Sequence, residues 1–240
     1  MMEVIPAIDL KDGRCVRLYQ GDYDRETVFS DDPSRVALAW QQAGAGRIHV
    51  VDLDGAREGR PTNLDALAGI LAAVSLPVQL GGGIRTHEDV GRVLGMGVQR
   101  AILGTAAVED PEMVARLCGE FGPETVIVSV DARDGKVATR GWLEHTRTEA
   151  VDLLRRMSDL GVERFVYTDV SRDGTLTEPN FAAIEHLVKA TGKRIIAAGG
   201  VSRVEHLARL AEVGVEGAIV GRALYTGDID LKEALEAVRG

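Results

Sequence analysis

The sequence has very little cysteine and no long apolar run. Among its 240 residues there are 2 cysteines, Cys15 and Cys118, too few for a disulfide framework, which indicates a reducing compartment. The first residues, MMEVIPAIDLKD, have neither the basic nor the apolar segment of a secretory signal, and no apolar run reaches membrane-spanning length. We therefore expect a cytoplasmic protein with no membrane partner.

Basic residues are scarce relative to acidic ones. The chain has 28 Lys and Arg against 37 Asp and Glu, a net charge of −9 at pH 7, and it contains no basic run. A nucleic-acid backbone requires a basic surface, so we expect no nucleic-acid partner. A small anionic ligand is still compatible, because local arginines and backbone amides can bind it.

Motifs for metals and nucleotides are missing as well. GxxxxGK, HExxH and CxxC do not occur, and the 5 histidines have no ligand spacing, so we predict no metal. The GMG at residues 95–97 precedes a predicted strand instead of following one, so it does not fit a dinucleotide site.

What the chain does contain is an internal repeat. DLKDGR at residues 9–14 returns as DARDGK at residues 131–136, and residues 83–106 align without a gap with residues 200–223. The second alignment has 9 identities in 24 positions, where average composition gives about one or two by chance. Two equivalent halves predict a ligand with two similar ends.

Short Val/Ile/Leu-rich runs alternate with helix-period segments. The runs are typical of parallel strands buried on both faces, and eight β/α units predict one (β/α)8 TIM barrel. Its single domain, residues 1–240, would consist of two fused (β/α)4 halves, about 1–122 and 123–240; a doubly wound open sheet is the alternative. The predicted strands are residues 4–8, 48–51, 78–80, 101–103, 126–130, 164–167, 194–197 and 218–220. The predicted helix N-caps are Asp32, Asn63, Asp110, Asn180 and Asp230.

The active site of such a barrel lies at the carboxyl ends of its strands. Asp9 and Asp131 end the first and fifth predicted strands, so we expect both carboxylates to face the mouth from opposite sides. Two facing carboxylates suit general acid–base catalysis, provided that their environments differ. The alternative is that each aspartate only caps a helix or forms a turn, which is the favoured interpretation for Asp12 and Asp134 in their Asp-Gly context.

Glycine loops follow strands in both halves. Gly81-Gly82-Gly83 and Gly199-Gly200 would let backbone amides approach an anion closely, as would Gly104-Thr105 and Gly221-Arg222 after the next strand. These loops predict two phosphate sites across the barrel. The alternative is that the glycines only make tight βα turns.

The longest predicted loops, residues 10–32 and 132–148, are candidates for lids over the mouth. They contain Arg17, Arg140 and Trp142, which could contact an anionic heteroaromatic ligand. His49 differs from its repeat partner Val166, so it is either a site residue or a core histidine.

Seven segments along the whole chain resemble those of one family: PAIDLKDGRCVRL, IHVVDLDGA, LGGGIR, SVDARDGKVATRGW, YTDVSRDGTL, AAGGV and IVGRALY. By these segments the chain is similar to the isomerases of histidine biosynthesis that convert the aminoaldose ProFAR to the aminoketose PRFAR by an Amadori rearrangement. That resemblance implies a duplicated (β/α)8 barrel, no cofactor and a small substrate with a phosphate at each end.

The resemblance also implies roles. Asp9 would be the base that removes the C2 proton, Asp131 the acid that protonates the ring oxygen, and Thr168 and Asp169 would assist. One phosphate would be bound by Gly82, Gly83, Gly104 and Thr105. The other would be bound by Gly174, Gly199, Gly200, Gly221 and Arg222.

Three other functions stay open at this point. The paralogous cyclase of the next pathway step shares both aspartates, but it usually has CLDV where this chain has AIDL, and it lacks the RGW segment. A bifunctional isomerase that also acts on phosphoribosyl anthranilate is compatible with RGW and with TD at residues 168–169. A non-catalytic sugar-phosphate sensor would have no use for two facing aspartates. Oligomeric state is open too, with a monomer as our expectation.

Overall fold

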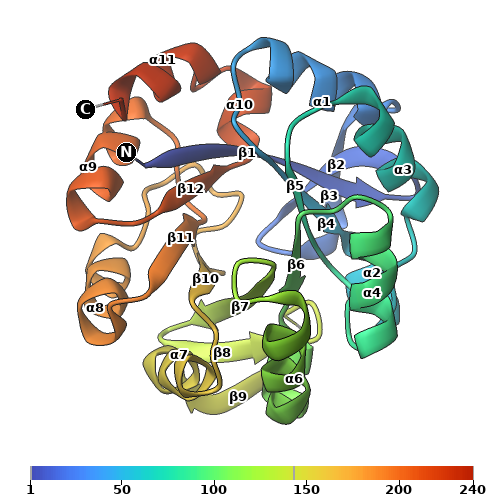
Figure 1. Ribbon diagram of the computed structural model, residues 1–240. Coiled ribbons are helices and arrows are strands. Elements are labelled where there is room, and N and C mark those ends of the chain that lie inside the picture. Colours follow the sequence, from blue (N-terminus) through green and yellow to red (C-terminus); the bar gives the residue numbers. More distant parts are fainter. Residues whose placement is uncertain (1, 143, 240) are drawn as a thin grey trace.

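The computed structural model describes residues 2–142 and 144–239, and its parallel strands form a closed barrel (Figure 1). Each barrel strand pairs with the next, and β10 pairs with β7 to close the ring. The predicted (β/α)8 barrel is therefore confirmed, and the open sheet is wrong. The barrel strands are β1 (Glu3–Lys11), β4 (Ile48–Asp52), β5 (Val78–Gly81), β6 (Arg100–Leu103), β7 (Val126–Arg133), β10 (Arg164–Asp169), β11 (Arg194–Ala198) and β12 (Gly217–Val220).

Helices surround the barrel (Figure 1). Asp32 and Asp110 cap α1 and α6 as predicted, each accepting a hydrogen bond from a first-turn amide, and Asp230 and Asn180 do the same for α11 and α8. Asn63 stands at the N-cap of α3 without making a side-chain cap. The helices are α1 (Pro33–Gln42), α2 (Leu53–Glu58), α3 (Leu64–Ala73), α4 (His87–Gly95), α5 (Thr105–Glu109), α6 (Pro111–Phe121), α7 (Ala150–Asp159), α8 (Phe181–Thr191), α9 (Val204–Val213), α10 (Arg222–Thr226) and α11 (Leu231–Ala237).

The two segments predicted as long loops are largely strands, so that prediction was wrong. β1 and β7 continue past their aspartates and turn back at Asp12-Gly13 and Asp134-Gly135, where all four residues have positive φ. β2 (Arg14–Tyr19) and β3 (Asp22–Ser30) extend β1 over the mouth, and β8 (Lys136–Thr139) and β9 (Glu144–Glu149) extend β7. β3 is mostly exposed and polar, so it lacks the apolar signal that revealed the barrel strands.

The inside of the barrel is filled by one small apolar layer. Alternate residues of each strand point inward, so Ile5 and Ala7 on β1 precede Asp9 on the same face, as Ile127 precedes Ser129 and Asp131 on β7. A larger apolar cluster lies between the barrel and the helices. The inner layer consists of Ile5, Ala7, Ile102, Ile127, Val166, Ile196 and Ile219.

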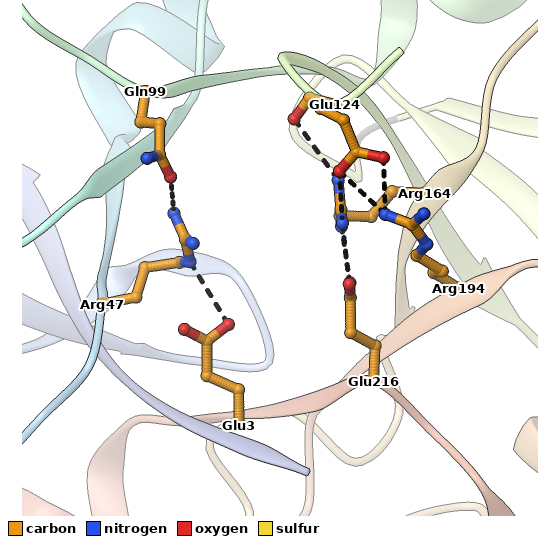
Figure 2. A network of polar contacts seen from close by, with 7 residues as sticks. All are labelled: Glu3, Arg47, Gln99, Glu124, Arg164, Arg194 and Glu216. Carbon is orange, nitrogen blue, oxygen red and sulfur yellow. Dashed lines mark hydrogen bonds and ion pairs between the residues drawn. The ribbon is translucent and has the colours of Figure 1, made fainter. Parts of the chain in front are cut away.

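Below this layer, at the amino ends of the strands, polar side chains form the floor of the barrel (Figure 2). Arg47 hydrogen-bonds to Glu3 and to Gln99. Arg164, which is 2% exposed, binds both carboxylate oxygens of Glu216. Both arginines are thus held by groups from other strands or their connections, which closes this end of the barrel.

The floor contacts follow the spacing of the sequence repeat. Arg47 and Arg164 are 117 positions apart, and so are their partners Gln99 and Glu216. Glu124 adds ion pairs to Arg164 at 2.9 Å and to Arg194 at 2.6 Å (Figure 2). The functional groups predicted from sequence all lie at the other end of the strands.

Candidate active site

Asp9 and Asp131 line one cavity in the mouth of the barrel. Their strands, β1 and β7, lie on opposite sides of the ring. Burial raises the pKa of each carboxyl above its usual value. The structure thus brings together a buried carboxyl, Asp9, and a partly buried one, Asp131, both with perturbed pKa values, which is typical of catalytic sites.

The surroundings of the two aspartates differ in charge. Arg17 on β2 donates from Nη1 to Asp9 Oδ2 at 2.7 Å, and this cation opposes the rise of the Asp9 pKa that burial causes. Within the described part of the chain no cation acts on the pKa of Asp131, and the polar side chains of Thr168, Trp142 and Ser129 oppose its rise instead. A neighbouring cation favours the ionised carboxylate more strongly than neutral hydroxyls do.

A third carboxyl, Asp173, lines the same cavity and was missed in the sequence analysis. Burial raises its pKa to about 6, Arg17 opposes the rise, and the charges of Asp9 and Asp131 add to it. The effect of Asp9 and Asp131 on the pKa of Asp173 shows that this third carboxyl belongs to the same electrostatic site. Asp173 lies in YTDVSRDGTL, where the glycine that follows it is typical of a turn and gives no sign of a cavity.

Asp169, in contrast, is engaged away from the cavity. Its carboxylate accepts hydrogen bonds from Ser171 and from Asn180 Nδ2, the latter at 2.8 Å, and it lines neither mouth cavity. Asp52, 117 positions earlier, accepts from Asn63 Nδ2 at 2.7 Å in the same way. The two aspartates hold the loops after β4 and β10.

The first glycine region lies in the main cavity. Gly82, Gly83, Gly104 and Thr105 all line it, and so does Arg85, which the sequence analysis did not single out although it ends LGGGIR. Gly104 is the N-cap of the short helix α5 and provides no side-chain cap, so no side chain at that position satisfies the first-turn amides.

The second glycine region borders a smaller neighbouring cavity. Gly221 is the N-cap of α10 as Gly104 is the N-cap of α5, again without a side-chain cap. Arg222 donates from Nη1 to the carbonyl oxygen of Gly174 at 2.8 Å. The predicted residues that line this cavity are Gly174, Gly199, Gly200, Gly221 and Arg222.

Two of the glycines are required by the loop itself. Gly82 and Gly83 have φ of +99° and +77°, a region that side chains other than glycine rarely adopt. A Cβ atom on Gly82 would overlap the backbone oxygen of Asp52, and one on Gly83 would lie 2.6 Å from the carbonyl of Arg60. These glycines therefore form the tight turn considered as the alternative, whether or not an anion binds beside them.

The extensions above the mouth meet across it. A Cβ atom on Gly21, between β2 and β3, would overlap the indole of Trp142, so the ring lies directly on that turn. Arg140 donates its amide to Thr105 Oγ1 at 2.9 Å, and its side chain pairs with Glu109 on α5. Trp142 and Arg140 line the cavity along with Arg17.

His49 on β4 also lines the cavity, on the strand next to Asp9. Burial and the charge of Arg17 lower its pKa to about 3, so the ring is neutral at physiological pH.

Within residues 2–142 and 144–239, no three His, Cys, Asp or Glu side chains come together in a way that could hold a metal ion. Over the same residues, no helix is long and apolar enough to span a membrane.

Fold and site together define an enzyme of the (β/α)8-barrel class. The model of one protein family, described as "Histidine biosynthesis protein", matches residues 3–230. The chain belongs to this family.

Curated relatives match along the full length of the chain. A protein of Roseiflexus castenholzii is 60% identical over 236 residues, covering 98% of this chain and 99% of its own. Proteins of Chloroflexus aggregans and Dehalococcoides mccartyi are 57% and 55% identical, each over 98% of this chain and 97% and 96% of their own. All three are named as the isomerase of 1-(5-phosphoribosyl)-5-((5-phosphoribosylamino)methylideneamino)imidazole-4-carboxamide.

Proposed function

We propose that this protein is the aldose–ketose isomerase of histidine biosynthesis that converts ProFAR, the ribotide in the names of its relatives, to PRFAR. The proposal rests on the observation that Asp9 and Asp131, from opposite strands, line the same cavity. The chain that carries them matches these isomerases over 98% of its length. An isomerase of this type needs a proton donor and a proton acceptor on the two sides of one sugar.

Asp9 is the candidate base and Asp131 the candidate acid. The Arg17 cation favours the carboxylate form of Asp9, which can accept a proton. Desolvation raises the pKa of Asp131, and no neighbouring cation offsets the rise as Arg17 does at Asp9, which favours the protonated form of Asp131. Their repeat counterparts show the asymmetry in sequence: Ser129 and Thr168 beside Asp131 correspond to Ala7 and Val51 beside Asp9.

The protons balance over the reaction. Asp131 protonates the ring oxygen as the C1–O bond breaks and an iminium forms, and Asp9 then removes the C2 proton to give an enolamine. Return of a proton to C1 and loss of the proton on the C2 oxygen yield the ketone and restore both carboxyls. Asp173, which has a pKa of about 6 and lines the same cavity, is a further candidate to carry a proton, whereas Asp169 positions the loop after β10.

The two glycine regions are the candidate phosphate sites. Each begins a short helix, and an arginine lines the cavity beside each, Arg85 at the first region and Arg222 at the second. Helix amino ends and arginines both bind phosphate. Trp142, Arg140 and His49 line the space between or above these regions and are candidates to contact the rest of the substrate.

We further propose a cytoplasmic monomer. Cys15 and Cys118 are free and buried, as suits a reducing compartment. Val28 and Leu38 are the large hydrophobic residues that are exposed in the described part of the chain, and both are only about two-fifths exposed, at 40% and 36%.

The test is turnover by the purified protein on ProFAR and, separately, on phosphoribosyl anthranilate. We expect turnover of ProFAR; turnover of the anthranilate substrate as well would extend the function to the bifunctional enzyme. Turnover of neither substrate, with retained binding of sugar phosphates, would overturn the proposal in favour of a sensor.

A further inference from the structure

His49, Gln79 and Arg100 form a row inside the barrel. They occupy in-register positions on the adjacent strands β4, β5 and β6. All three are buried, and Gln79 is 0% exposed. Arg100 precedes Ile102 of the inner apolar layer by two residues, so it faces inward too. The row runs from the cavity at His49 towards the floor at Arg100.

The contact between Gln79 and His49 specifies where the ring proton lies. Gln79 Nε2 is 3.1 Å from His49 Nδ1. An amide nitrogen can only donate, so Nδ1 must accept and carries no proton. A neutral imidazole has one N–H group, which must then be on Nε2.

Two buried polar atoms bear on the orientation of the Gln79 amide. Within the described part of the chain, Gln79 Oε1 and Arg100 Nη1 are buried and have no protein hydrogen-bond partner. One is an acceptor and the other a cationic donor, on neighbouring strands in register, and a direct contact or one bridging water would satisfy both. The opposite orientation of the amide would turn an N–H group towards the cation and an oxygen towards His49.

We propose that Gln79, oriented by Arg100, is a positioning residue that holds His49 as the Nε2–H tautomer, so that His49 offers a neutral hydrogen-bond donor to a substrate oxygen beside Asp9. His49 is on the strand next to Asp9, in register with Ala7 on β1. A donor fixed in advance stabilises the charge that develops on that oxygen when the neighbouring proton is removed. This role of His49 rests on the proposed function, whereas the tautomer does not.

Nitrogen-15 NMR of the histidine-labelled protein without substrate tests the tautomer directly. The signals of His49 are assigned by their loss in His49→Asn. In the wild type we expect an unprotonated Nδ1 and a protonated Nε2. In Gln79→Glu, where a carboxylate can only accept and Arg100 supplies its counter-ion, we expect the proton to move to Nδ1. A wild-type ring protonated on Nδ1, or an unchanged tautomer in Gln79→Glu, would overturn the inference.

Kinetics test the consequence. We expect Gln79→Glu to lower kcat about 10- to 100-fold with a much smaller change in KM, because it misplaces a donor instead of removing a binding group. The side chain of Gln79→Met donates no hydrogen bond, so the kcat of this variant should lie between that of the wild type and that of Gln79→Glu. Gln99→Met on the floor is the matched control and should retain both the wild-type tautomer and kcat. If ProFAR is not turned over at all but the tautomer is as expected, the proposed function fails and the positioning of His49 stands.

Discussion

Arg17 joins the candidate base to the second glycine region. Its Nη1 donates to Asp9 Oδ2 at 2.7 Å, Nη2 donates to the carbonyl oxygen of Ala7 at 2.9 Å, and a Cβ atom on Gly221 would overlap its guanidinium. Arg17 also lines both mouth cavities, together with Asp173. A substrate that spans both glycine regions must therefore displace or contact this one side chain.

Replacing either candidate catalytic aspartate by asparagine should reduce turnover of ProFAR about 10²- to 10⁴-fold, because the amide cannot exchange the proton. The glycine regions are unchanged in Asp9→Asn and Asp131→Asn, so protection of both variants against heat by inorganic phosphate should match the wild type. Full activity in both variants would contradict the acid–base assignment.

Arg17→Met should shift the pH dependence of kcat/KM. The Arg17 cation lowers the pKa of Asp9, so its removal raises that pKa. Because a base must be ionised, the acidic limb of the profile should move to higher pH. Arg14→Met, on the same strand but partly exposed with its charge paired to Glu26, is the matched control and should leave the limb in place. If the acidic limb of the kcat/KM profile is the same in Arg17→Met and the wild type, Arg17 does not control the pKa of the catalytic base.

Asp173 should make the fold less stable as the pH rises from about 4 to about 6. Its pKa is about 6 in the folded protein against 3.8 for an ordinary aspartate, so over this window the folded state holds a proton that the unfolded state has lost. The free energy of unfolding should therefore be highest below pH 4 and decrease as the pH rises through 6. A pKa shift of this size corresponds to a decrease of about 3 kcal/mol. Asp173→Asn should abolish this loss and raise the free energy of unfolding at pH 8 by up to about 3 kcal/mol.

Urea unfolding of Asp173→Asn and the wild type at pH 4 and pH 8 measures that loss. The exposed Asp134, also followed by glycine, supplies the control Asp134→Asn, which should follow the wild type at both pH values. Equal pH dependence in Asp173→Asn and the wild type would show that this carboxyl is ionised normally.

Gly82→Ala and Gly91→Ala should affect stability in opposite directions. Alanine at residue 82 must adopt a positive φ and displace the backbone of Asp52, which should cost about 3 kcal/mol or more. Gly91 lies inside α4 with open space around it, so alanine there should add about 0.5–1 kcal/mol. Thermal and urea unfolding of the two variants measure both changes in stability. A Gly82→Ala variant as stable as the wild type would contradict the close approach of residue 82 to the backbone of Asp52.

The sequence predicted the parts of the molecule that carry a strong periodic or repeated signal. Each predicted apolar run lies in a barrel strand, and the alternation along β1 and β7 placed Asp9 and Asp131 towards the mouth. β3 was missed because its residues are mostly polar and exposed, so its pairing with β2 depends on contacts between segments and not on burial.

Residues whose role depends on distant neighbours were harder to predict. Asp173 follows no strand directly, and its raised pKa comes from burial in the cavity and from Asp9 and Asp131, far away in the sequence. The structural role of Asp169 was visible in principle, because Asp52 and Asn63 recur as Asp169 and Asn180 at a constant spacing of 117 residues.

The polar contacts of Arg47 and Arg164 lie at one end of the barrel and the candidate catalytic carboxyls lie at the other. Arg47 contacts Glu3 at the start of β1, and Arg164, at the start of β10, contacts Glu216 just before β12, so side-chain contacts connect strand ends at the end remote from the carboxyls. Rim segments such as β2–β3 and β8–β9 can consequently be exchanged or redesigned for other sugars while the scaffold beneath them stays intact.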